Sequence, residues 1–200
     1  MTGHHDHAAA ASWGGLLVMA LVMALMMAPF LIEPLTHVRE RTLRHLRVAA
    51  ASEFSLTYVA AWFAIAMVLL ALARPITHAW DGTLVFGLAC VGLAVWQLSD
   101  TRVRVATRCG PSFCPQPSGW RSHLGASWGG AREAGSCARS SGGSMVLMVL
   151  APALGLMVLV WVIHVWEMRP GRDPFIEART AQPAIAYAGL AVSTLAFTLV

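Results

Sequence analysis

Five long apolar runs divide this 200-residue chain, and they constrain its fold more than any motif does. The runs cover residues 13–32, 54–73, 79–98, 144–166 and 183–200. A helix needs about 20 largely apolar residues to cross a bilayer, whereas a membrane β-strand alternates apolar and polar residues over about ten positions. The sequence therefore predicts an all-α fold, a polytopic membrane helical bundle with about five transmembrane helices. The last run is the shortest, so its full crossing is left open.

The low charge content supports a bilayer as the environment. Charged residues make up 12% of the chain and apolar residues 57%, whereas an average soluble domain is about 25% charged. A soluble enzyme, a disordered chain and a small disulfide scaffold are all disfavoured by this composition. No basic segment precedes the first apolar run, so we expect no cleavable signal peptide.

The basic residues are all arginine, and they gather on one side of the predicted spans. Ten of the 14 lie between the first and second runs or between the third and fourth. Because cytoplasmic loops carry the excess of positive charge, we expect a multi-pass protein of the bacterial inner (plasma) membrane with its N-terminus outside. The predicted partner is membrane lipid, and the same bias explains the basic loops without nucleic acid.

The runs define four segments. Residues 1–12 form a His-rich extracytoplasmic tail, and residues 13–98 form a three-span segment with a basic cytoplasmic loop at 33–53. Residues 99–143 form an Arg/Gly/Ser/Pro-rich cytoplasmic loop with too few aliphatic residues to build a core of its own, and residues 144–200 form a two-span segment. Within the first loop, residues 36–52 fit either a basic amphipathic helix at anionic headgroups or an ordinary positive loop.

The N-terminal tail carries a candidate metal site. Removal of Met1 would leave Thr2, Gly3 and His4 as a free end, whose amine, amides and imidazole can form a square-planar set for Cu(II) or Ni(II). His5 and His7 add imidazoles. The alternative is a mobile polar tail that carries histidines by chance.

The first apolar run carries several methionines. Met19, Met23 and Met26 share one helical face, and Met27 follows. Thioethers are soft neutral ligands that suit Cu(I). Methionine is equally a space-filler in helix packing, which is the alternative interpretation.

The fourth run repeats this pattern. Met157 and His164 lie on one face together with Trp161 and Met168, and Glu167 follows one turn after His164. Ionisable side chains near a span are functional candidates. Met145 and Met148 begin the same run, so the first and fourth runs together could offer thioethers at several depths. The alternative is an interfacial histidine paired with Glu167.

The loop cysteines form a third candidate. Cys109, Cys114 and Cys137 lie in the predicted cytoplasmic segment with His123, so free thiols or thiolate ligands are expected there rather than disulfides. Three cysteines and one histidine could form a tetrahedral site that takes zinc, although the spacing is not the tight pair of strong zinc signatures. The remaining cysteine, Cys90, lies within a span and is expected to pack as a small apolar residue.

Several short stretches together resemble the bacterial family of predicted metal-binding integral membrane proteins, a domain of unknown function. The stretches are MALVMALMMAP at Met19–Pro29, YVAAW at Tyr58–Trp62, WQL at Trp96–Leu98 followed by Arg102 and Cys109, and the region from Cys137 to Glu167. The resemblance places Cys137, Met145, Gly155, Met157 and Glu167 on the family pattern and implies metal binding.

The chain also departs from that pattern. Ser140 and Ser141 stand where the family has adjacent cysteines, and Val105 stands near its first loop cysteine, while Cys114 is additional. The methionine positions therefore match the family better than the thiols do, and the departures weaken the predicted loop site.

These observations predict a membrane protein that captures, stores or delivers a soft transition metal, with copper as the predicted ion. A cuproenzyme or other membrane subunits are the expected protein partners. Phosphate-binding, nucleophile-elbow, HExxH and haem-attachment motifs are absent from the sequence, so we expect no enzyme. One alternative is an accessory or assembly subunit of a larger membrane complex with no metal of its own, in which the methionines and glycines serve helix contacts. Another is a membrane enzyme that uses His164 and Glu167 as an acid–base pair.

Overall fold

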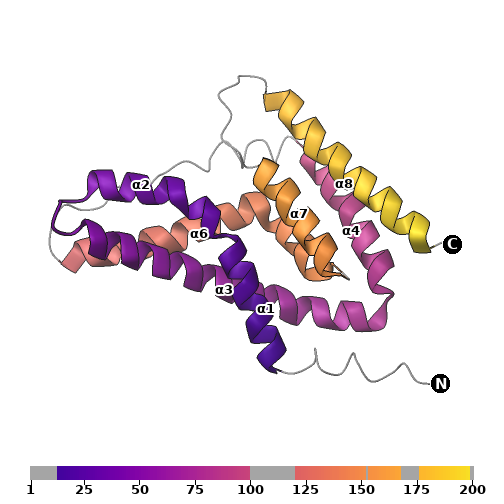
Figure 1. Cartoon of the computed structure of the whole chain (residues 1–200), viewed down its shortest axis with the longest axis horizontal. Coiled ribbons are helices and arrows are strands. Elements are labelled where there is room, and N and C mark those ends of the chain that lie inside the picture. The colour runs from indigo at the N-terminus through magenta and orange to yellow at the C-terminus, as the bar shows by residue number, and fades with distance from the viewer. Residues whose placement is uncertain (1–12, 100–119, 152, 168–175, 199–200) are drawn as a thin grey trace. The chain divides into compact units, whose positions relative to one another are not determined.

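The computed structural model describes residues 13–99, 120–151, 153–167 and 176–198 of the chain (Figure 1). These residues form helices and no strand, which confirms the all-α class for the described part. The elements are α1 (Trp13–Met26), the 3-10 helix η2 (Ala28–Leu31), α2 (Ile32–Arg41), α3 (Arg47–Ala79), α4 (Gly82–Gln97), α6 (Trp120–Leu150), α7 (Leu154–Glu167) and α8 (Ile176–Thr198).

The chain divides into two compact units. Unit 1 comprises Met1–Leu70 and Gly110–Cys137, and unit 2 comprises Ala71–Cys109 and Ala138–Val200. Helices α3 and α6 each contribute residues to both units.

In unit 1, the first apolar run ends in a bend rather than in a loop. Helix α1 stops at Met26, and the helical axis turns by 42° before η2 and α2. The sequence predicts a stop at Glu33–Pro34, but α2 passes through both residues and continues to Arg41. Pro34 is tolerated because the N–H groups of a first helical turn have no acceptor inside the helix. The basic segment 33–53 is therefore largely helical, with only a short connection before Arg47.

Helix α3 carries a bulky buried ridge through unit 1. Phe54, Tyr58 and Trp62 are at most 1% exposed and recur every four residues. Helix α6 faces this ridge with small residues: a side chain at Gly130 would collide with the carbonyl oxygen of Phe54, and Ala126 and Ala134 are fully buried one turn away on either side. Small residues at four-residue spacing let two helix backbones approach closely.

This packing corrects the description of residues 120–143 as a loop, and it buries one face of them without a core of their own. Residues 120–143 lie within α6, although their Gly, Ser and Arg content is typical of loops. This segment is helical despite its small side chains, because the bulky apolar ridge of α3 fills the interface that the small residues of α6 leave open.

In unit 2, α4 and α8 are the main packing pair. The side chain of Leu195 lies against Gly87, so close that an added Cβ would clash. Asp81 caps α4, because its carboxylate accepts hydrogen bonds from the backbone N–H groups of Thr83 (2.7 Å) and Leu84 (3.2 Å).

The position of a proline explains one further difference from the predicted spans. The run 144–166 is not one helix, since α6 ends at Leu150 and α7 begins at Leu154. Pro152 stands between them in the sequence; a proline lacks the N–H and disfavours the helical conformation of the residue before it. Pro75 and Pro183, by contrast, lie within α3 and α8.

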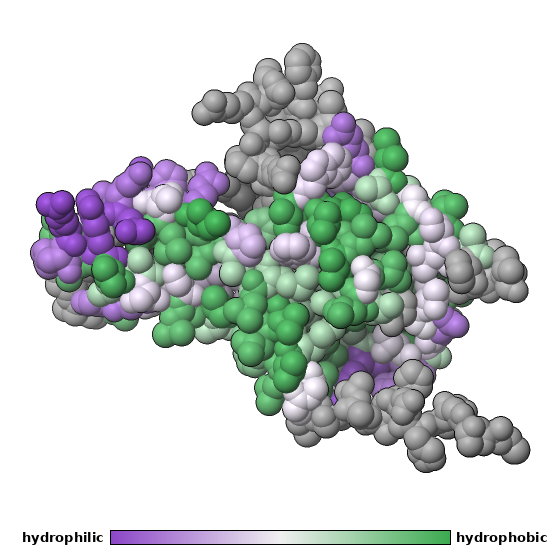
Figure 2. Space-filling view, viewed as in Figure 1, coloured by the Kyte–Doolittle hydropathy of each residue, from purple (hydrophilic) through white to green (hydrophobic). Residues whose placement is uncertain are grey.

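Only one described helix, α3, is long and apolar enough to cross a membrane by length and composition alone. Gly14–Met26 and Ala28–Arg41 would add a second if the bent pair is one broken span. Helices α4 and α7 are apolar but shorter, with 16 and 14 residues. Hydrophobic residues nevertheless cover most of the face in Figure 2, and hydrophilic residues gather where α2 turns into α3.

Candidate functional site

Several predicted ligands lie outside the described residues. They are the tail residues Thr2, Gly3, His4, His5 and His7, the loop cysteines Cys109 and Cys114, and the side chain of Glu167, the residue that ends α7. The predicted sites that depend on them stay predictions. The remaining candidates are the methionines of α1, Cys137, and the group on α6 and α7.

The methionines of the first apolar run, which the spacing places on one helical face, differ in their burial. Met23 and Met27 are buried, whereas Met19 and Met26 are half-buried. The buried face also includes Ala20 and Ala24. Met27 lies where α1 gives way to η2, so the two buried thioethers mark the end of α1 at its bend.

In unit 2, the ends of α6 and α7 carry a concentrated group of buried soft donors. Met145 and Met148 on α6 are fully buried, and Met157 and His164 on α7 are 2% and 1% exposed. Met145 and Met148 share a face at three-residue spacing, and Met157 and His164 share one at seven-residue spacing. We call these four side chains the hairpin donors.

The short connection brings part of this group together. Helix α7 starts four residues after α6 ends and turns back from it (Figure 1). Met148 lies two residues before the end of α6, and Met157 lies three residues after the start of α7. Both are thus within about one turn of the connection, and His164 lies two turns further along α7.

The chemistry of the hairpin donors restricts what they can hold. Among the described residues, no three His, Cys, Asp or Glu side chains lie together as a metal-binding group. Three of the four hairpin donors are methionines, so a metal held there would be coordinated mainly by thioether sulfur. Methionine sulfur and imidazole nitrogen select soft or borderline ions, above all Cu(I), rather than Mg²⁺ or Ca²⁺.

Cys137 lies in a different environment from the one predicted. It is buried in α6 within unit 1, and its thiol points to the Glu133 carboxylate at 3.9 Å. Tyr58, which packs edge-on against Trp62 with ring centroids 6.3 Å apart, interacts electrostatically with the same thiol. Burial raises the pKa of Glu133, an effect that the thiol partly opposes and that Glu33 reinforces.

Glu133 and the packing roles of Tyr58 and Trp62 were not predicted from the sequence. The signal that could have found them is the recurrence of small residues along 126–137, because such a face requires a bulky partner helix. A four-residue aromatic ridge at 54–62 is the complementary pattern.

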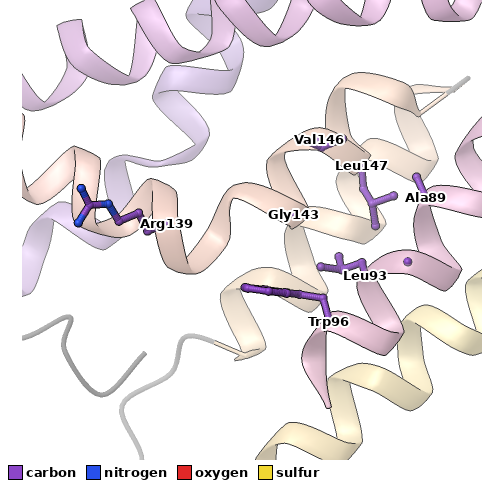
Figure 3. A pocket seen from close by; sticks show the side chains of 8 residues that line it. Ala89, Leu93, Trp96, Arg139, Gly143, Val146 and Leu147 are labelled. Atoms are coloured by element: carbon purple, nitrogen blue, oxygen red, sulfur yellow. The ribbon is translucent and has the colours of Figure 1, made fainter. Parts of the chain in front are cut away.

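A pocket of about 400 Å³ lies between α4 and α6 in unit 2 (Figure 3). Leu93 and Trp96 line one side, and Val146 and Leu147 line the other. The Arg139 side chain points away from these apolar residues in Figure 3. None of the hairpin donors lines the pocket, so it is separate from the candidate metal site.

The described fold and its buried side chains define an all-helical protein that keeps thioethers and an imidazole in its interior. The chain belongs to the family described as PpoB2, copper chaperone, which matches residues 16–181. The match confirms the predicted relation to copper and includes the buried α1 methionines, Cys137 and all the hairpin donors. No curated protein and no solved structure gives a significant match to the chain.

Proposed function

We propose that this chain is an integral membrane protein that carries copper as cargo, and that the hairpin donors hold the ion as Cu(I). The observation that carries this proposal is the nearly complete burial of Met145, Met148, Met157 and His164 on two helices joined by one short connection. Membership in a copper chaperone family supports copper as the cargo.

The donor set suits temporary holding rather than permanent binding. Thioethers are neutral and soft, so they match Cu(I) without adding negative charge to an apolar interior. They also lack the charge with which a thiolate cluster binds copper tightly. A cargo site of this kind can pass its ion to a stronger binding site on a partner, and a cuproenzyme is the partner class we propose.

The other predicted ligands take supporting roles in this proposal. The tail with His4, His5 and His7 would capture metal outside, and the buried Met23 and Met27 would offer a second thioether pair. The segment predicted to be cytoplasmic would receive the metal at Cys109, Cys114 and Cys137. Zinc is the alternative ion there. Because Cys137 is buried beside Glu133, an incoming ion reaches it only if α3 and α6 separate locally.

Exposed apolar side chains support the membrane part of the proposal. Isolated exposed apolar residues are ordinary, but contiguous ones indicate contact with lipid or protein. Such residues occur in rows on three helices: Leu17, Val18, Leu21 and Leu25 on α1, Leu84, Leu88, Val91 and Val95 on α4, and Val158, Leu159 and Val162 on α7. We propose five spans in the inner membrane, with the arginine-rich segments in the cytoplasm.

Copper content measured by elemental analysis tests the cargo site. Detergent-purified, tag-free protein is loaded with Cu(I) and dialysed against a weak chelator. We expect the wild type to retain copper and Met148→Leu/Met157→Leu to lose most of it, because leucine keeps the volume and removes the sulfur. His164→Gln should weaken retention as well.

The matched control is Met67→Leu, which removes a half-buried thioether of α3 that belongs to neither methionine group. Copper that is retained equally by the double variant and the wild type would refute the hairpin site. Wild-type protein that retains no copper and co-purifies with stoichiometric partners would favour the accessory-subunit alternative.

A further inference from the structure

Unit 1 contains a groove between α2 and α3 that the proposed copper chemistry does not use. Its volume is about 460 Å³. Arg39 and Arg47 line one end, and Ile32, Leu35 and Val48 line its apolar walls. Ile32 is 67% exposed and Val48 is 82% exposed, so these walls have no cover in the described chain.

The lining is cationic and offers no other charge. No carboxylate is among the residues that line the groove. The hydroxyls of Thr36, Ser52 and Ser55 donate to carbonyl oxygens of their own helices at 2.7–2.8 Å, so they add no donor to a ligand. An occupant is therefore held by the two guanidinium groups, which prefer phosphate.

Arg47 is already positioned for such a role. Its Nε donates to the carbonyl oxygen of Thr42 at 3.2 Å, and Thr42 is itself buried and bonded to the carbonyl oxygen of Val38 at 2.6 Å. This hydrogen bond uses the Nε of Arg47 and leaves its terminal guanidinium nitrogens for a ligand. Arg47 is also the first residue of α3, and a helix N-terminus adds to the attraction for an anion.

The apolar walls run away from the arginines in one direction. Ile32, Leu35 and Arg39 share one face of α2, and Val48, Ala51 and Ser55 share one face of α3. From Arg39 to Ile32 the wall is about 10 Å long at 1.5 Å per residue. A cationic end followed by an apolar trough matches an amphiphile with an anionic head.

We propose that this groove binds one anionic phospholipid, with its phosphate between Arg39 and Arg47 and the start of an acyl chain along Ile32, Leu35 and Val48. The inference rests on the proposed membrane location. It agrees with the predicted orientation, since the arginines lie in the segment expected at the cytoplasmic surface, where anionic headgroups attract basic groups.

Native mass spectrometry in a non-ionic detergent tests the groove. Wild-type protein is titrated with dioctanoyl phosphatidylglycerol, with dioctanoyl phosphatidylcholine and with inorganic phosphate. We expect phosphatidylglycerol to bind at one site with a dissociation constant roughly tenfold or more below that of phosphatidylcholine. Inorganic phosphate should not displace it at comparable concentration, because it lacks the acyl chain.

The charge is tested with two double variants that change net charge equally. Arg39→Gln/Arg47→Gln should reduce phosphatidylglycerol affinity to the level of phosphatidylcholine, whereas Arg41→Gln/Arg44→Gln, outside the groove lining, should leave it within about twofold. An equal loss in both pairs would show diffuse surface attraction and overturn the proposal. Arg39→Gln alone keeps the bond between Arg47 and Thr42 and serves as the test if the first pair loses helical content.

The apolar wall is tested with Ile32→Asn/Val48→Asn, which changes exposed residues and leaves the arginines in place. We expect phosphatidylglycerol to bind more weakly, and unchanged binding would overturn the proposed acyl trough. Copper retention should be the same in all these variants as in the wild type. Failure of the lipid site is therefore distinguishable from failure of the copper site, and flotation of the wild type with vesicles tests the membrane location separately.

Discussion

The helices of the two units are packed together by different kinds of side chain. Unit 1 sets the rigid ridge of Phe54, Tyr58 and Trp62 against a small-residue face on α6. Unit 2 buries the hairpin donors, three of which are flexible methionines. Aromatic rings lock a geometry, whereas methionine adapts to irregular space. The contrast is between a fixed packing geometry in unit 1 and a more adaptable one in unit 2, where we propose the copper site.

The largest expected effect comes from truncating the ridge. Trp62→Ala should lower the free energy of unfolding by about 3–5 kcal/mol, because it leaves a cavity in a packed interior. Met157→Leu in unit 2 should cost less than about 1.5 kcal/mol, since the volume is kept. Denaturant unfolding followed by circular dichroism measures both, and losses of equal size would remove the contrast between the units.

The next largest loss of stability is expected where a side chain is added to a closely packed glycine of α6. Gly130→Ala should cost about 1–3 kcal/mol, since the new Cβ meets backbone of α3 that cannot rotate away. Gly143→Ala should cost less, because it meets only the side chain of Leu93.

Gly135→Ala is the matched control for this series. It has open space around it and should stabilise the helix by up to about 1 kcal/mol through helix propensity. Thermal unfolding of the three variants under identical conditions gives the order, and a Gly130 variant as stable as the Gly135 variant would contradict the close approach of α3 and α6.

A smaller effect is expected from a buried polar contact in unit 2. The hydroxyls of Ser144 and Tyr187 lie 3.1 Å apart and share a hydrogen bond. Ser144→Ala and Tyr187→Phe should each cost about 1 kcal/mol. The double variant should cost less than the sum of the two, because both remove the same bond, and strictly additive costs would argue against the contact.

The smallest effect concerns pH and the Glu133 carboxyl in unit 1. Because its pKa is raised in the folded chain, the folded state favours the protonated form. Its stabilising contribution is complete below the pKa of the unfolded chain and is lost as the pH rises through the folded pKa. Glu133→Gln should flatten this part of the profile of unfolding free energy against pH, and an unchanged profile would assign the dependence to other groups.

Particular residues show how far the sequence was informative. The uncharged run that starts at Phe54 predicted the interior of α3, and the run that ends at Leu98 predicted α4, because continuous apolar stretches leave few alternatives to a helix. The helix at 120–143 could not be predicted, since Gly, Ser and Arg at these positions are typical of loops. The spacing of Met157 and His164 predicted a common face of one helix, and both side chains are buried there.

The sequence by itself determined the helical class, the segregation of arginine and the soft donors, because these follow from composition and periodicity along one chain. The relation to copper came from short motifs in the same sequence, and the family match confirms it. Only the tertiary structure decided that Gly130 of α6 lies against the backbone of Phe54, and that Cys137 is buried beside Glu133 and Tyr58. Such pairings depend on how the faces of separate helices fit together, and that fit is a property of two surfaces rather than of either segment alone.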